Sequence, residues 1–150
     1  MKMKMKLILV ALVTLTLQFS YAQKGWKNVG NVQGGKGVLS IDKAATLKKF
    51  TANLFKHSKI DGAFTNLELL PVEGGNYVLL FSGSSYKSTV FVKSEGGVLK
   101  AMTGTICTTS DCSSEPRGCL VMYEGGEIGY CSPCANGGKC TKTTTSEELF

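Results

Sequence analysis

The chain has 150 residues, with 17 basic and 11 acidic side chains and a net charge of +6 at neutral pH. All basic residues but Arg117 are lysines and no dense basic run occurs, so the composition argues against a nucleic-acid-binding protein. His57 is the only histidine, so any histidine-based catalysis would have to use it. The sequence contains no G-x-S-x-G nucleophile motif. We therefore expect a protein without catalytic residues.

The first 22 residues have the pattern of a signal peptide. Lys2, Lys4 and Lys6 precede an apolar run from Leu7 to Leu17, which is too short for a stable transmembrane helix. The small residues of Ser20-Tyr21-Ala22 predict cleavage before Gln23, and an uncleaved anchor is the alternative. We expect a secreted or periplasmic protein with no membrane contact after cleavage. The remaining 128 of the 150 residues suffice for one domain.

Residues 23–39 contain five glycines, which predicts an irregular or extended arm. A helix is predicted next, with Ser40 as its N-cap, running to about His57 and ended by Asp61-Gly62. Its apolar residues recur at steps of three and four and form one face: Ala44, Leu47, Phe50, Leu54 and Phe55.

Four strands are predicted after the helix, at residues 64–72, 76–82, 88–93 and 98–105. The turns that join them are short and rich in glycine, so they permit antiparallel hairpins and exclude helical crossovers. The predicted fold class is therefore α+β, with one amphipathic helix packed on a four-stranded antiparallel meander over residues 40–106.

All six cysteines lie between residues 107 and 140, and a polar tail over residues 141–150 follows them. In an exported chain an even number of cysteines favours disulfides, which would stabilise a segment that has few apolar side chains. A hairpin centred near Gly125 would place Cys119 opposite Cys131, so we predict that these two are bonded. The predicted disulfide cysteines are Cys107, Cys112, Cys119, Cys131, Cys134 and Cys140.

Two other interpretations of the cysteines stay open. Cys107, Cys112, Cys131 and Cys134 have the spacing of a four-thiolate zinc site, which would make zinc a cofactor where none is otherwise expected. The Cys131-Ser132-Pro133-Cys134 sequence also has the spacing of a redox-active pair, although the chain after Cys134 has the composition of a turn and not of a helix.

Residues 70–77 carry a resemblance to a known family. Leu70-Pro71-Val72-Glu73-Gly74, followed by Asn76-Tyr77, is similar to the Q-x-V-x-G hairpin of the cystatins with its Gln replaced. The resemblance implies a helix packed on an antiparallel sheet. It also implies inhibition of papain-like cysteine proteases, with Val72 and Gly74 in the inhibitory hairpin and the Gly34–Gly37 arm beside it.

The first expectation for function is an exported, non-catalytic binding or structural module, stabilised by disulfides, whose partner is a protein or a surface ligand. A cystatin-like inhibitor and a cysteine-thiolate metal-binding protein are the alternatives. The six cysteines and the residue 72–74 hairpin are the features on which these expectations depend.

Overall fold

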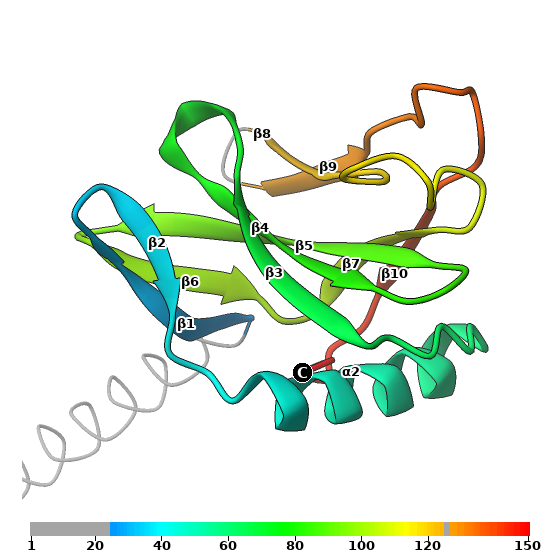
Figure 1. Ribbon diagram of the computed structural model, residues 1–150, viewed down its shortest axis with the longest axis horizontal. Helices are drawn as coiled ribbons and strands as arrows, with labels where there is room; N and C mark the ends of the chain where they lie inside the picture. Colours follow the sequence, from blue (N-terminus) through cyan, green and yellow to red (C-terminus); the bar gives the residue numbers. More distant parts are fainter. Residues whose placement is uncertain (1–24, 125–126) are drawn as a thin grey trace, which may run out of the picture.

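The computed structural model describes residues 25–124 and 127–150, and the predicted signal peptide lies outside them. Helix α2 (Lys43–Ser58) packs below an antiparallel sheet of eight strands, and a pair of strands, β8 and β9, lies above it (Figure 1). The predicted α+β class is therefore confirmed. Within the described ranges, no helix combines the length and the apolar character needed to cross a bilayer.

Strand β5 (Lys87–Glu95) is the centre of the large sheet. One of its edges pairs with β4, and the other pairs with β7 over its first residues and with β6 over its last. Strands β3, β1, β2 and β10 extend the sheet outward from these neighbours. The other strands are β1 (Trp26–Gln33), β2 (Lys36–Leu39), β3 (Asn66–Pro71), β4 (Tyr77–Ser82), β6 (Val98–Met102), β7 (Thr105–Thr109), β8 (Val121–Glu124), β9 (Glu127–Cys131) and β10 (Thr141–Thr144).

The predicted meander corresponds to β3, β4, β5 and β6, which follow one another antiparallel. The predicted strand over residues 98–105 was too long, since it ends at Met102 and a separate strand, β7, begins at Thr105. Paired glycines with positive φ make two of the turns, Gly74-Gly75 before β4 and Gly96-Gly97 before β6. Glycine adopts these conformations without steric cost, so the predicted glycine-rich turns are confirmed at these two positions.

The predicted glycine-rich arm is instead a β-hairpin. Strands β1 and β2 pair antiparallel around Gly34 and Gly35, whose φ values are 55° and 77°. Two consecutive residues with positive φ make the tight turn that hairpins favour. The glycines thus form a turn inside the sheet, and β1 continues the sheet by pairing with β6.

Helix α2 begins two residues later than predicted. Asp42 is the N-cap, and its carboxylate accepts the Ala45 N–H at 2.9 Å. Ser40 lies two residues before this cap, and its N–H donates to the Val29 carbonyl of β1. The helix ends at Ser58, where Lys59 takes the left-handed conformation and its N–H donates to the Phe55 carbonyl. That C-cap, and not Asp61-Gly62, stops the helix.

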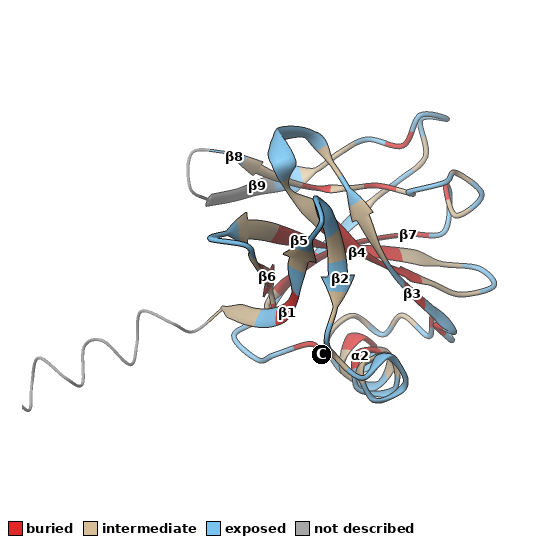
Figure 2. Cartoon of the chain, turned by 60° about the vertical axis from the view of Figure 1, so that its left-hand side comes forward, coloured by how far each residue is buried: buried red, intermediate tan, exposed pale blue. Residues whose placement is uncertain are grey.

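The central strands of the large sheet are buried on both faces, which Figure 2 shows as red along β4, β5 and β7. Side chains alternate along β5, so Val90 and Val92 face the helix while Phe91 faces the β8–β9 pair. The core on the helix side contains Phe50 and Leu54 of α2. The other core is built mainly from cysteines, with Phe91 and Val121.

The predicted polar tail is part of the folded domain. Residues Thr141–Thr144 form β10, which pairs with β7. Leu149 and Phe150 are 0% and 1% exposed and belong to the helix-side core. Two apolar residues in an otherwise polar segment are enough to anchor it, because complete burial of each is strongly favourable.

Candidate functional site

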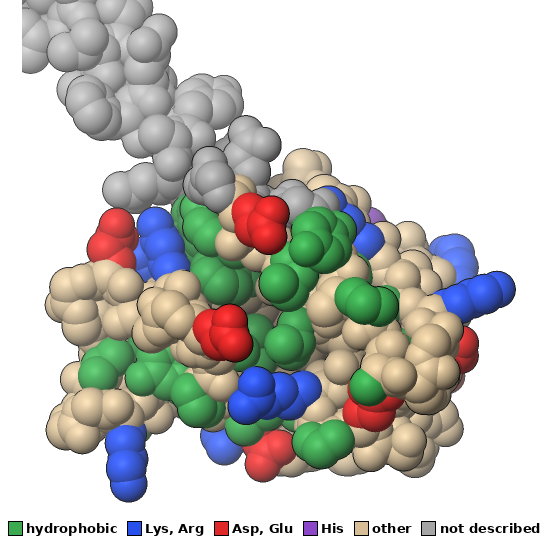
Figure 3. Space-filling view, turned by 90° about the horizontal axis from the view of Figure 1, so that it is seen from above, with side chains coloured by type: hydrophobic (Ala, Val, Ile, Leu, Met, Phe, Trp, Pro, Cys, Tyr) green, Lys and Arg blue, Asp and Glu red, His purple; other side chains and the backbone are tan. Residues whose placement is uncertain are grey.

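A groove of about 560 Å³ lies between the turn that joins β3 to β4 and the strand β8. Residues of that turn form one wall, and five consecutive residues, 120–124, together with Arg117 form the other. Figure 3 views this side of the molecule, where apolar side chains gather around a hollow that has charged side chains at its edge. The volume falls within the roughly 300–1,000 Å³ that is typical of ligand-binding sites.

The floor of the groove follows from strand alternation. Val78 of β4 and Phe91 of β5 are cross-strand partners on the sheet face that points away from the helix. Phe91 stacks on Tyr123 of β8, with ring centroids 4.7 Å apart and planes 13° apart. Trp26 contacts both rings edge-on, and Lys93 lies 4.4 Å from the Trp26 ring. The aromatic contacts thereby fix β8 over the sheet, beside Val78 of β4, which is itself buried.

Three charged side chains line the groove: Arg117, Glu73 and Glu124. All three are exposed, and none forms a hydrogen bond or an ion pair with another residue in the described part of the chain. A guanidinium without a protein partner can bind a carboxylate through two parallel hydrogen bonds. The groove therefore combines an apolar floor with one cation and two anions at its rim.

The predicted inhibitory hairpin forms one wall of this groove. Val72 and Gly74 both line it, and the Val72 N–H donates to the Asn76 carbonyl at 2.9 Å. Gly74 has a φ of 74°, which favours glycine. The predicted second element, the Gly34–Gly37 arm, adjoins this hairpin at Gly37, where a β-carbon would stand 2.6 Å from Leu69 and 2.7 Å from Tyr77.

All six cysteines form disulfides, as predicted, but the predicted Cys119–Cys131 bond is wrong. The bonds join the first cysteine to the fourth, the second to the fifth and the third to the sixth: Cys107–Cys131, Cys112–Cys134 and Cys119–Cys140. The β8–β9 hairpin places Val121, and not Cys119, opposite Cys131. Cys131 bonds to Cys107 because β7 of the large sheet runs beneath the hairpin, which local hairpin geometry could not reveal.

The same bonds bear on the metal and redox interpretations. The four predicted zinc ligands are the members of two disulfides, so each sulfur is bonded to another and none is a thiolate. Cys131 and Cys134, the predicted redox pair, are bonded to different partners. A zinc site at these residues would require the reduction of both bonds, because only thiolates bind the metal.

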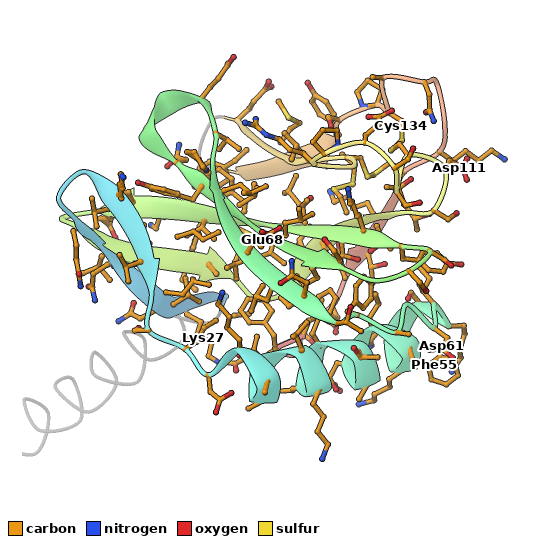
Figure 4. The ribbon with its side chains drawn as sticks, viewed as in Figure 1. Lys27, Phe55, Asp61, Glu68, Asp111 and Cys134 are labelled. Atoms are coloured by element: carbon orange, nitrogen blue, oxygen red, sulfur yellow. A yellow bond between two sulfur atoms is a disulfide. The ribbon has the colours of Figure 1, made fainter. Side chains whose placement is uncertain are left out.

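The loops that carry the cysteines are held by polar contacts as well. Figure 4 labels Asp111 and Cys134 at the same end of the molecule. The Asp111 carboxylate accepts the Lys139 N–H at 2.9 Å, and its carbonyl accepts the Asn136 side chain at 2.9 Å. The Lys139 hydrogen bond lowers the pKa of Asp111, and a hydrogen bond from Ser110 acts in the same direction. These contacts stabilise the loops that the disulfides join.

His57 belongs to α2, on the opposite side of the sheet from the groove (Figure 1). Its Nε2 lies 3.1 Å from the carboxylate of Glu147, which also accepts a hydrogen bond from Lys56 at 2.8 Å. The Lys56 hydrogen bond lowers the pKa of Glu147, and the His57 contact and the Lys56 charge act in the same direction. His57 therefore joins the helix to the carboxy-terminal segment.

The sequence interpretation missed Phe91, Arg117 and Met122 as groove residues. Phe91 faces away from the helix in the structure, where Val90 and Val92 face it, and no sequence signal indicated what covers the Phe91 face. Comparison of the chain with protein-family models, with curated proteins and with solved structures finds no match.

Proposed function

We propose that this protein is an exported, disulfide-stabilised binding module that acts without catalysis and holds an extended peptide segment of a partner protein in the groove between the β3–β4 turn and β8. The observation that carries the proposal is the groove itself, which has an apolar floor and a rim with one unpaired cation. Apolar sites with a few placed polar groups are the usual form of a ligand-binding site.

Export is supported by two independent features. The first 22 residues have the pattern of a signal peptide, and three disulfides join all six cysteines of the chain. Disulfides of this kind persist in oxidising compartments and are rare in the cytosol. The absence of catalysis is an inference from residue types, since the only histidine, His57, already contacts Glu147 on the helix side of the sheet.

The chemistry of the groove indicates which peptide it would hold. The partly exposed side chains of Val72, Leu120 and Met122 offer apolar contacts for one aliphatic or aromatic side chain. Arg117 would bind a carboxylate of the same peptide, either an acidic side chain or the terminal carboxylate. Glu73 and Glu124 would favour a basic residue at the other positions. Strand β8 pairs with β9 on one side only, so the groove runs beside a strand, which suits an extended ligand.

A selection from displayed random peptides tests the proposal. The mature wild-type protein is the bait, and the enriched peptides are measured by fluorescence anisotropy. We expect peptides that combine an apolar residue with an acidic one. Arg117→Glu should weaken their binding roughly tenfold or more, because a charged hydrogen bond contributes about 1.5–3 kcal/mol.

Lys48→Glu is the matched control, since Lys48 is an exposed cation of α2, on the far side of the sheet from the groove. It makes the same change in net charge and should leave binding unchanged. The proposal fails if no peptide is enriched over an unrelated disulfide-bonded bait, or if both charge reversals weaken binding equally.

A second candidate function is the inhibition of papain-like cysteine proteases. It is favoured by the proximity of Gly37 to Leu69 and Tyr77, which brings the Gly34–Gly37 turn region next to the predicted inhibitory hairpin. Wild-type protein at micromolar concentration should then inhibit papain, and Val72→Asp should remove the inhibition. Papain activity that is unchanged by wild-type protein would exclude this function and leave the peptide-binding proposal standing.

A further inference from the structure

Two of the three disulfides lie against each other. The sulfur atoms of Cys107, Cys131 and Cys140 are all within 4.8 Å of one another, although Cys107 is bonded to Cys131 and Cys140 to Cys119. Cys107 and Cys119 are buried at 0% and 1% exposure, whereas Cys131 and Cys140 are partly exposed. A sulfur that belongs to one bond thus stands close to both sulfurs of another.

We propose that Cys107, Cys131 and Cys140 form an internal thiol–disulfide exchange site, in which Cys140 attacks the Cys107–Cys131 bond whenever the Cys119–Cys140 bond is open. Disulfide exchange needs a thiolate that reaches a disulfide sulfur. A separation of at most 4.8 Å leaves only a small movement before the roughly 3–3.5 Å of a reactive approach.

A small exogenous thiol opens the first bond. Its thiolate attacks the partly exposed Cys140 sulfur and forms a mixed disulfide, while Cys119 leaves as a thiolate and takes a proton. A second thiol attacks the exogenous sulfur of the mixed disulfide and releases Cys140 as a thiolate. Two thiols are thereby oxidised to one small disulfide, and one protein disulfide is reduced to two thiols.

The internal step is redox-neutral. The Cys140 thiolate attacks the Cys107 sulfur, the Cys107–Cys131 bond breaks, a Cys107–Cys140 bond forms, and Cys131 leaves as a thiolate. Cys131 is the better leaving group because it is partly exposed, and water stabilises the thiolate there, whereas burial at Cys107 would penalise the charge. The new bond would join β7 to the residue before β10, its neighbour in the sheet.

The exchange would release the β8–β9 pair from the large sheet. In the structure, Cys131 at the end of β9 is tied to Cys107 of β7. After exchange both bonded cysteines belong to the β7–β10 side, and β9 keeps no covalent link of its own. Cys112–Cys134 takes no part, because neither sulfur belongs to the three-sulfur group and both cysteines are buried, next to the Thr109 hydroxyl.

The test uses two variants that remove the same disulfide. Cys119→Ser leaves Cys140 without its partner, inside the group, and Cys140→Ser leaves Cys119 without its partner, outside it. Each protein is held at pH 8, where thiolate is present, then alkylated and mapped by peptide mass spectrometry. In Cys119→Ser we expect the larger share of the label on Cys131, together with a Cys107–Cys140 peptide. In Cys140→Ser we expect the label on Cys119 alone.

The proposal is overturned if Cys119→Ser carries its label only on Cys140 with the Cys107–Cys131 bond intact, or if both variants exchange to the same extent. If either variant does not fold, an experiment on the wild-type protein tests the proposal instead. With limiting small thiol and an acid quench, a Cys107–Cys140 peptide should appear while Cys112–Cys134 is intact, and its absence at every degree of reduction would equally overturn the proposal.

Discussion

At the scale of single residues, Glu147 links the carboxy-terminal segment to the helix. Its carboxylate is bound by Lys56 and His57 of α2, and it comes from the segment that carries Leu149 and Phe150 into the core. Lys56 and His57, in the last turn of the helix, thus have a specific partner beyond their favourable position at the negative end of the helix dipole.

Glu147→Gln should lower the thermal unfolding midpoint at neutral pH by a small amount. Hydrogen bonding with Lys56 lowers the pKa of Glu147 below its ordinary value of 4.5 in the folded protein. A lowered folded pKa contributes stability that is present above pH 4.5 and is lost as the pH falls through the lowered value. The difference between wild type and variant should therefore shrink to zero in acid, as measured by unfolding midpoints across pH.

Glu68→Gln is the control, because Glu68 is an exposed carboxylate of β3, labelled in Figure 4, with no ion pair in the described part of the chain. It should change the midpoint less than Glu147→Gln at neutral pH. A Glu147→Gln difference that persists unchanged in strong acid would contradict the role of this carboxylate.

At the scale of elements, α2 shows how far periodicity predicts packing. Phe50 and Leu54 are fully buried, as expected, but Phe55 is 50% exposed and projects from the end of the helix (Figure 4). Consecutive residues point about 100° apart on a helix, so Leu54 and Phe55 cannot both face the same sheet. The buried face of α2 is narrower than predicted, and the position of the sheet determines which of its apolar side chains are buried.

Phe50→Ala should destabilise the protein by about 3–5 kcal/mol, because it removes a buried ring and leaves a cavity. The Phe50 ring stacks on Phe81 with centroids 3.7 Å apart and meets Phe64 edge-on at 5.1 Å. Phe55→Ala, on the same helix, should cost far less. Urea unfolding followed by circular dichroism measures both, and equal losses in the two variants would show that the helix packs differently.

The β1–β2 hairpin is the element that the sequence misrepresented most. Its glycines predicted an irregular or extended arm, yet Gly34 and Gly35 make a tight turn and Gly37 permits close contact with Leu69 and Tyr77. Glycine is required both for flexible segments and for close packing of backbones, so its frequency alone does not separate the two.

At the scale of the whole molecule, the carboxy-terminal segment closes the helix-side core. Leu149→Ala should destabilise the protein by about 2–5 kcal/mol, since Leu149 is fully buried. Ser146→Ala, in the exposed part of the same segment, should have little effect. A Leu149→Ala variant as stable as wild type in urea would mean that the segment does not belong to the core.

The mature protein should begin at Gln23 and carry three disulfides. Amino-terminal sequencing after expression in an exporting host tests the cleavage point. The intact mass should be lower than that of the reduced chain by six hydrogens, two for each disulfide. Thiols that react with an alkylating agent without prior reduction, or a chain that keeps residues 1–22, would contradict the proposal of an exported, oxidised module.

Local chemistry was enough to predict the helix, the meander and the oxidation of all six cysteines. The three- and four-residue apolar steps and the glycine turns each act over a few residues, and the structure keeps them. Val72 and Gly74 lie between the paired strands β3 and β4, and their role as an inhibitory hairpin stays a prediction.

The tertiary structure alone decided the disulfide pairing and the groove. The β8–β9 pair folds back over the large sheet, whose central strand β5 pairs with three others. This arrangement brings Cys107 to Cys131 and places Val78 in the same groove as the residues of β8. Those contacts join residues far apart in the chain, and their energy depends on which apolar faces remain uncovered after the local elements form. No spacing within a single segment carries that information, which is why hairpin geometry alone led to the wrong partner for Cys131.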